Sequence, residues 1–240
     1  MRHRSASRLA LATLYLASAC GAPEPEPLEG LAPTFEVDGN GTVVEVGATV
    51  KADEIDRVMA GRIFAEGVST YDDVVSEQTF VNHLAIEFNP NGHGPPGVND
   101  VPHFDVHFYG ISIEARGSIT CDGQPVPDPE RVPAGYDASA VGAPPFGSCE
   151  PEMGVHAGDE DSLEGKLDAE LILGYDRGSL VFIEPMIHAS HFEARDTMTL
   201  EIPRPQVLGR ETLWPSTFTL SFDQAADVFT FTLGDFAPIR

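Results

Sequence analysis

The chain has 240 residues, of which 38 are acidic and 14 basic, and its formal net charge at pH 7 is −24. A surface this acidic repels phosphate groups, which argues against nucleic acid as a partner. The acidic residues are dispersed through the sequence, a pattern that favours solubility rather than storage of cations.

Residues 1–19 have the pattern of a signal peptide. Three arginines precede an apolar run at residues 9–19, which is too short to span a bilayer. The run ends in A-S-A-C, which resembles a bacterial lipobox with Cys20 as the lipidated first residue of the mature chain. The alternative is an ordinary secretory signal followed by a chance cysteine. Both interpretations predict an extracytoplasmic chain, and the first anchors it by lipid to the cell membrane or the outer membrane.

Residues 20–33 are predicted to form a lipid-anchored tether. Proline and glutamate alternate in this segment, a composition that cannot build a core and favours an extended polyproline conformation. The remaining residues, 34–240, are enough for a single domain with a sizeable core.

Cys121 and Cys149 are the two cysteines left if Cys20 carries lipid. In an oxidising compartment they are expected to form one disulfide; the alternative is two separate buried thiols. They enclose a segment rich in Pro, Gly and Ala, which is expected to have little regular structure. We therefore predict an insert at residues 121–149, closed by a disulfide.

Short strands separated by turn signals dominate the rest of the sequence. The turns D-G-N-G, G-Y-D-R-G-S and D-Q-A-A-D each join two such strands into a predicted hairpin. The expected strands are residues 34–37, 42–46, 80–88, 104–113, 167–173, 180–187, 197–202, 216–222 and 228–233. A short helix is expected at residues 53–61. This pattern predicts a mainly β fold, an antiparallel sandwich or barrel-like single domain with a short helix.

The segment P-H-F-D-V-H-F-Y places His103, Asp105 and His107 on one face of a strand and apolar residues on the other. Imidazole and carboxylate are good ligands for zinc and other divalent transition metals. In a regular strand His103 and His107 lie roughly 13 Å apart, too far to share one tetrahedral ion. Neighbours two residues apart can share one, and Pro102 allows His103 to belong to the preceding loop. Asp105 has an alternative role, which is to orient a ligand imidazole.

Three residues elsewhere are further candidate metal ligands. His93 stands in N-G-H-G-P-P-G, whose glycines and prolines allow the loop to fold back over the strand; the alternative is a surface histidine. His156 stands in M-G-V-H-A-G-D. Glu184 lies within an apolar strand, where a buried carboxylate needs a partner; the alternative is an outward-facing residue.

Two other histidine motifs are weaker candidates. His188 and His191, in H-A-S-H, are expected to be solvated in a loop, and His83 with Glu87 forms a weak pair on one strand face. No nucleophile elbow, H-E-x-x-H helix, P-loop or dinucleotide-binding motif is present in the sequence.

Four blocks of the sequence, taken in order, resemble a bacterial domain family of unknown function that is typified by a small hypothetical protein from Thermus. The blocks are G-H-G-P-P-G-V-N-D-V-P-H-F-D-V-H-F-Y, M-G-V-H, F-I-E-P-M-I and W-P-S-T-F-T-L-S-F. The resemblance covers most of residues 34–240 and implies a β-rich extracytoplasmic domain, often found in lipoproteins. Its motif positions correspond to His93, His103, Asp105, His107, His156 and Glu184. The insert enclosed by Cys121 and Cys149 is particular to this chain.

These observations support three hypotheses about function. The first is a membrane-tethered domain that binds Zn²⁺ or another divalent metal. The second is a metal-free structural or interaction lipoprotein, which could form a homo-oligomer. The third is a metal-dependent hydrolase with a metal-activated water as nucleophile. The sequence identifies neither a substrate nor catalytic residues, and convergence of the candidate ligands in space is what separates the hypotheses.

Overall fold

A computed structural model describes residues 25–94, 97–138, 148–159 and 167–240. The predicted signal peptide and the lipidation residue Cys20 lie outside the described residues, as do residues 139–147 of the predicted insert. None of the helices in the described ranges has both the length and the apolar character needed to cross a membrane.

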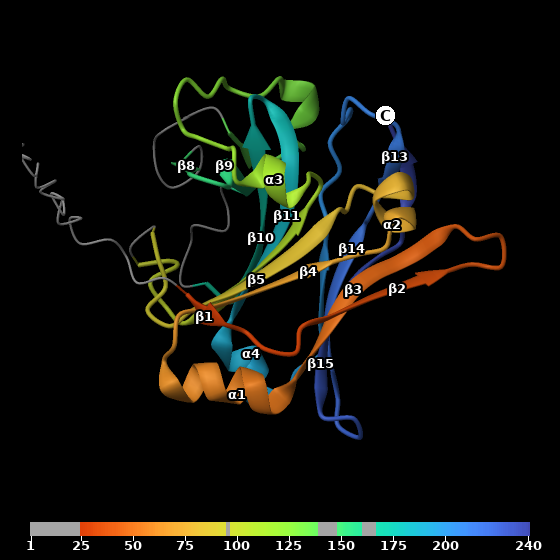
Figure 1. The fold of residues 1–240 in the computed structure, drawn as a ribbon. Helices are drawn as coiled ribbons and strands as arrows, with labels where there is room; N and C mark the ends of the chain where they lie inside the picture. The colour runs from red at the N-terminus through yellow and green to blue at the C-terminus, as the bar shows by residue number, and fades with distance from the viewer. Residues whose placement is uncertain (1–24, 95–96, 139–147, 160–166) are drawn as a thin grey trace, which may run out of the picture.

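Within the described residues, the larger of two main sheets has nine strands in the order β1-β4-β5-β6-β11-β10-β9-β7, with β8 also paired to β9 (Figure 1). All its neighbours are antiparallel except β1 and β4. The strands are β1 (Glu26–Pro27), β4 (Ala65–Thr70), β5 (His83–Asn89), β6 (His103–Tyr109), β7 (Tyr136–Asp137), β8 (Cys149–Glu150), β9 (Gly154–Asp159), β10 (Ala169–Asp176) and β11 (Ser179–His188).

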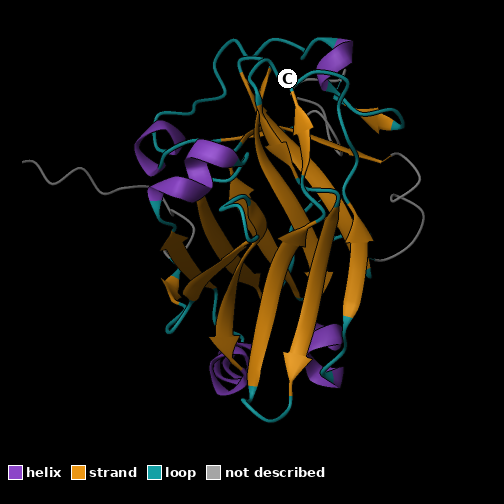
Figure 2. Cartoon of the chain, turned by 90° about the vertical axis from the view of Figure 1, so that its right-hand side faces the viewer, coloured by secondary structure: helices purple, strands orange, loops and turns teal. Residues whose placement is uncertain are grey.

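The second sheet packs against one face of the first, so the described chain is a sandwich-like β domain (Figure 2). Its order is β12-β14-β15-β3-β2, and β13 pairs with β16 alongside. These strands are β2 (Ala32–Val37), β3 (Val43–Lys51), β12 (Met198–Glu201), β13 (Thr212–Trp214), β14 (Thr217–Asp223), β15 (Val228–Gly234) and β16 (Ala237–Ile239). The helices are α1 (Ala52–Gly61), α2 (Asp73–Gln78), α3 (Ile113–Arg116) and α4 (Ala189–Ala194), with a 3₁₀ turn at Pro129–Arg131.

The main core fills the space between the two sheets and is rich in aromatic rings. The ring centroids of Phe104 on β6 and Phe192 on α4 lie 4.3 Å apart, and those of Phe192 and Phe229 on β15 lie 5.1 Å apart. Because strand side chains alternate, Phe104, Val106 and Phe108 all enter this core, as the sequence pattern predicts. The intervening residues of β6 project from the opposite face of the sheet, and that face carries the polar groups discussed below.

The three predicted hairpins and the predicted helix are confirmed. β2 pairs with β3, β10 with β11 and β14 with β15, and α1 covers the predicted helical residues. Between β10 and β11, Arg177 and Gly178 have φ of +46° and +76°, the signature of a tight hairpin turn. The strand predicted to reach Ile113 instead ends at Tyr109, because Ser112 accepts a hydrogen bond from the Ala115 amide and caps helix α3.

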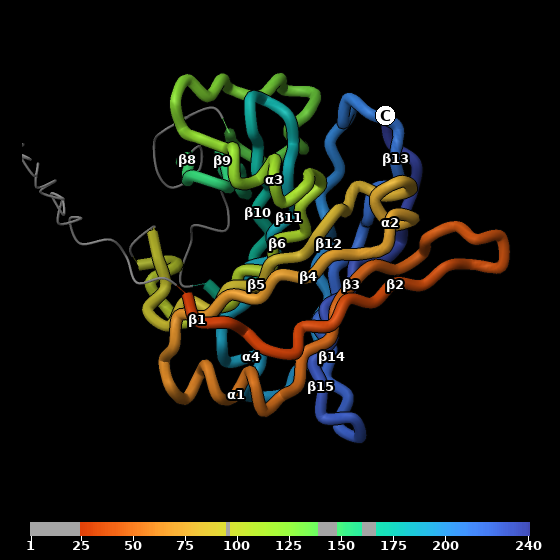
Figure 3. Tube along the Cα trace, in the orientation of Figure 1, coloured from red at the N-terminus to blue at the C-terminus, as the bar shows by residue number. Residues whose placement is uncertain are grey.

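The tether prediction is wrong for residues 26–33, which belong to the folded domain. Figure 3 shows this first segment lying along β4, at the edge of the larger sheet. The Leu28 amide donates to the Glu66 carbonyl at 2.8 Å, and the Leu28 side chain is buried. Pro27 is compatible with an edge strand because an edge leaves half of the backbone groups unpaired. The domain therefore begins before residue 34.

The predicted disulfide between Cys121 and Cys149 is confirmed, with a Cα–Cα distance of 5.7 Å. It joins the segment after α3 to β8, at the start of the chain that leads into β9. The residues that flank Cys149, Ser148 and Glu150, line the cavity described next.

Candidate metal centre

A cavity of about 470 Å³ lies on the face of the larger sheet that points away from the second sheet. Its floor comes from β5, β6, β10 and β11, and its walls come from the loop before β6 and from the segment around β8. The side chains that line it are those of Glu87, Asn89, His93, Asn99, Asp105, His107, Ser148, Glu150, Pro151, Met153, His156, Ile172, Glu184 and Met186, together with Gly94.

The loop between β5 and β6 carries His93 back over β6. Gly92 has φ of +67°, and a Cβ at this position would collide with the backbone of Asn99 and Val101, so glycine is required. The His93 amide donates to the Asn99 carbonyl at 3.0 Å and closes the loop. The sequence interpretation that this loop folds over the strand is thus confirmed.

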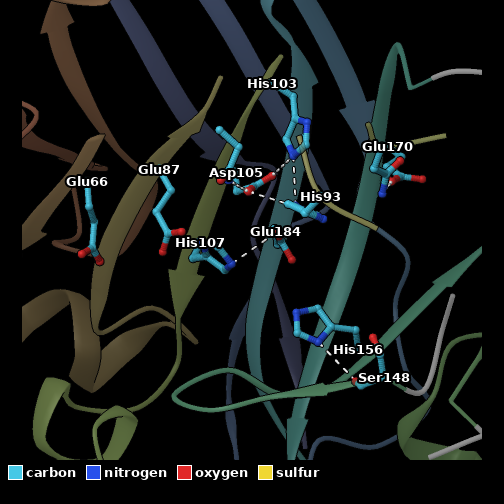
Figure 4. A network of polar contacts seen from close by, with 12 residues as sticks. Glu66, Glu87, His93, His103, Asp105, His107, Ser148, His156, Glu170 and Glu184 are labelled. Carbon is cyan, nitrogen blue, oxygen red and sulfur yellow. Dashed lines mark hydrogen bonds and ion pairs between the residues drawn. The ribbon is translucent and has the colours of Figure 1, made fainter. Parts of the chain in front are cut away.

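His93, His103 and Asp105 form one compact group, which we call the His93–His103–Asp105 group (Figure 4). The two Nε2 atoms lie 3.0 Å apart. Nε2 of His103 lies 3.1 Å from Asp105 Oδ1, and Nε2 of His93 lies 3.3 Å from Asp105 Oδ2. His103 and Asp105 are buried, whereas His93 forms the exposed side of the group.

The backbone determines which ring nitrogen of each histidine carries hydrogen. Nδ1 of His93 lies 2.9 Å from the Gly94 carbonyl, and Nδ1 of His103 lies 2.7 Å from the Val101 carbonyl. Because carbonyl oxygens only accept, both Nδ1 atoms are donors, and in the neutral rings both Nε2 atoms are acceptors. Two imidazole lone pairs and a carboxylate therefore face one another, an arrangement that only a cation between them makes favourable: a proton or a metal ion.

The pKa values in this group reflect the same crowding of acceptors. Burial opposes charge on His93, but its hydrogen bond to Asp105 and the carboxylate charge raise the pKa of His93 to about 10. The pKa of His103 is raised too, because the Asp105 charge outweighs the effect of burial. Burial alone would raise the pKa of Asp105, yet the two histidines hold it well below its usual range.

Asn89 orients the carboxylate of the group. Its Nδ2 donates to Asp105 Oδ2 at 2.6 Å, and the β5–β6 register sets Asn89 opposite His103. Hydrogen bonds from a neighbouring side chain fix a ligand carboxylate in one orientation and are part of a metal site. Asn89 was not predicted from the sequence as part of the site, since its role depends on strand register.

His107 and Glu184 form a separate pair deeper in the cavity, which we call the His107–Glu184 pair (Figure 4). Nε2 of His107 lies 3.2 Å from Glu184 Oε1, and both side chains are almost fully buried. Burial alone would lower the pKa of His107, but the Glu184 charge raises it. The ring packs edge-on against Phe182 and parallel to Tyr109. Neither residue belongs to the His93–His103–Asp105 group.

His156 lines the cavity but stands apart from both sets of residues in hydrogen bonding. Its Nδ1 lies 3.4 Å from the Ser148 carbonyl, and burial lowers its pKa. Of the six predicted ligands, therefore, three converge as one group, two form a pair, and His156 occupies the wall. Glu87, on the cavity floor, has its pKa raised to about 7 by burial; the sequence predicted it only as a weak partner of His83.

The histidines of the weaker motifs do not line the cavity. His188 accepts a hydrogen bond from the Ser190 amide and caps α4, while His191 pairs with Asp168 at 2.9 Å. His83 stacks on Tyr109 and contacts the Ile111 carbonyl at 3.0 Å. These contacts satisfy His188 and His191 without a metal, whereas Nε2 of His83 is buried without a hydrogen-bond partner among the described residues.

The His93–His103–Asp105 group could hold a metal ion, because its ligand atoms all lie within 4.8 Å of one another. The chemistry of two imidazoles and one carboxylate suits a divalent transition metal. In comparisons with known proteins, no family model, no curated protein and no solved structure matches this chain.

Proposed function

We propose that this chain is an extracytoplasmic domain that binds one divalent transition metal through His93, His103 and Asp105. The observation that carries the proposal is the convergence of three acceptors, two of them Nε2 atoms whose partner nitrogens already donate to carbonyls. Their separations are 3.0, 3.1 and 3.3 Å. Ligands held about 2.0–2.1 Å from one ion are separated by about 3.0–3.4 Å, so the group needs little movement to accept a metal.

Zinc is the first candidate ion. Three protein ligands with a fourth position open to a cavity is a common zinc arrangement, and two histidines with one carboxylate also suit iron(II). The lipid anchor at Cys20 is part of the proposal and rests on the A-S-A-C motif. Because β1 begins at Glu26, a lipidated Cys20 would hold the domain within about 20 Å of the membrane surface. Membrane fractionation of Cys20→Ser tests the anchor; an unchanged membrane fraction would contradict it.

The metal site is tested by replacing His103 with alanine. We expect the substitution to remove one equivalent of bound zinc and to weaken binding at this site by at least about a hundredfold, since a buried ligand is lost. Metal content is measured by elemental analysis of protein stripped with chelator and then reloaded. His191→Gln is the matched control, because it removes a histidine whose partners are Asp168 and Asp196, outside the cavity. Metal well below one equivalent in the unsubstituted chain, or equal content in His103→Ala, would overturn the proposal.

Zinc affinity at this site is expected to rise about tenfold per pH unit between pH 6 and 8, because the ion displaces one proton. A single proton between the two Nε2 atoms satisfies both rings, whereas a second would set two N–H donors against each other. Burial opposes that proton, but Asp105 raises the pKa of His93 to about 10, so protons compete well above the pKa of about 6.5 of a free imidazole.

The metal-free chain is expected to show the opposite trend in stability. A pKa that is raised on folding contributes stability in full below about pH 6.5, and this contribution is lost as the pH rises toward 10. Competition titrations with a chromophoric chelator at three pH values measure the zinc affinity. A zinc affinity that is independent of pH would contradict the predicted rise of about tenfold per pH unit.

A further inference from the structure

We infer that the cavity binds a second divalent cation, at the His107–Glu184 pair. This site uses none of the three ligands of the proposed first site, although both open on the same cavity. His156, which lines the same cavity, is the candidate for a third ligand.

The first argument is the lack of hydrogen-bond partners for the buried pair. Within the part of the chain that the structure describes, both ring nitrogens of His107 lack a hydrogen-bond partner, and so does Glu184 Oε2. His107 Nε2 lies 3.2 Å from Glu184 Oε1, but this contact does not have hydrogen-bond geometry. Each buried polar atom left without a partner costs about 1–3 kcal/mol, and a cation bound by Nε2 and the carboxylate removes part of that cost.

The second argument is that an ion at the first site cannot serve this pair. The ligand atoms of His93, His103 and Asp105 lie within 4.8 Å of one another, and those of His107 and Glu184 fall outside that group. His107 follows His103 by four residues along β6, which separates their Cα atoms by roughly 13 Å. One metal ion has ligands at about 2 Å, so the two sets require two ions.

The third argument is the charge of the cavity. Four carboxylates line it, those of Glu87, Asp105, Glu150 and Glu184, and the lining residues within the described ranges include no lysine or arginine. Arg116 compensates Glu87 in part from outside the lining, at 3.6 Å. Glu150 is exposed to solvent, but the other three carboxylates carry more negative charge than one divalent ion neutralises, and a second ion compensates the excess. Anions are correspondingly poor occupants of this space.

The competing explanation for the pair is a protonated His107 held against Glu184 as a structural ion pair. The two explanations predict different numbers of zinc ions bound per chain. We expect metal-free protein to take up two equivalents of zinc, measured by calorimetric titration and by elemental analysis after gel filtration. Replacing both residues, as His107→Gln with Glu184→Gln, should leave one equivalent, and His103→Ala should also leave one. Glu184→Gln alone preserves side-chain shape and serves as a second variant if the double replacement does not fold.

Each outcome separates this inference from the proposed function. One equivalent in the unsubstituted chain that is kept in the double variant but lost in His103→Ala would overturn the second site and support the first. Two equivalents retained in both the double variant and Glu184→Gln would also overturn the second site. No bound zinc in the unsubstituted chain would overturn both. His191→Gln should match the unsubstituted chain throughout, and circular dichroism confirms that each variant is folded.

Discussion

Removal of bound metal by a chelator is expected to lower the melting temperature of this protein by about 8–16 °C. An ion that binds only the folded chain, present at a thousand times its dissociation constant, stabilises that state by about 4 kcal/mol. For a domain of this size, each kcal/mol corresponds to about 2–4 °C. The unfolded chain offers no comparable site, because His93 reaches His103 and Asp105 only through the closed loop before β6.

The His103→Ala variant provides the control for this effect. It lacks a ligand of the proposed site, so its melting temperature should depend less on chelator than that of the unsubstituted chain. Differential scanning calorimetry with and without chelator measures both. If chelator changes neither protein, and His103→Ala is destabilised equally in both conditions, the histidines have a structural role and the domain is a metal-free one.

Loss of the Cys121–Cys149 disulfide is expected to lower the free energy of unfolding by about 3–4 kcal/mol. The bond closes a loop with a sequence separation of 28 residues, and its removal restores conformational freedom to the unfolded chain. The expected measurement is a lower urea midpoint in Cys121→Ser with Cys149→Ser, with an equal or steeper dependence on denaturant because the unfolded chain is less compact.

The same variant should bind zinc less tightly, because Ser148 and Glu150 on either side of Cys149 line the cavity wall. The unsubstituted protein under reducing conditions is the matched control and should unfold like the double variant. A loss of stability below about 1 kcal/mol would mean that the segment is held by its packing and by the pairing of β8 with β9 rather than by the disulfide.

Local features of this fold were predictable from the sequence because their physical causes are local. The hairpin between β10 and β11 follows from a turn in which Gly178 and its neighbour adopt positive φ. The two faces of β6 follow from strand alternation, which sends Phe104 to the core and Asp105 to the opposite face. The disulfide was predictable from the number of cysteines, since only Cys121 and Cys149 were left to pair once Cys20 was assigned to the lipid anchor.

The N-terminal boundary of the domain was predicted wrongly because the prediction was based on amino-acid composition alone. A segment rich in proline and glutamate favours an extended chain in isolation, but β4 offers an unpaired edge to which Glu26 and Leu28 donate backbone hydrogen bonds. That edge belongs to a strand some 40 residues further along the chain, Ala65–Thr70. The sequence of the first residues therefore does not reveal that a pairing partner is present.

The candidate site divides in the same way between local and long-range causes. Strand alternation already predicted that His103 and Asp105 are neighbours on one strand face, and the glycine-rich composition of the loop allowed it to bring His93 to them. The contacts from Asn89 to Asp105, and from Glu184 to His107 rather than His103, are evident only from the three-dimensional fold. These contacts depend on the registers of β5 and β11 against β6, and a shift of one residue would reverse the face of every side chain. The strand register is selected by burial across the whole sheet, so no short segment of the sequence specifies it.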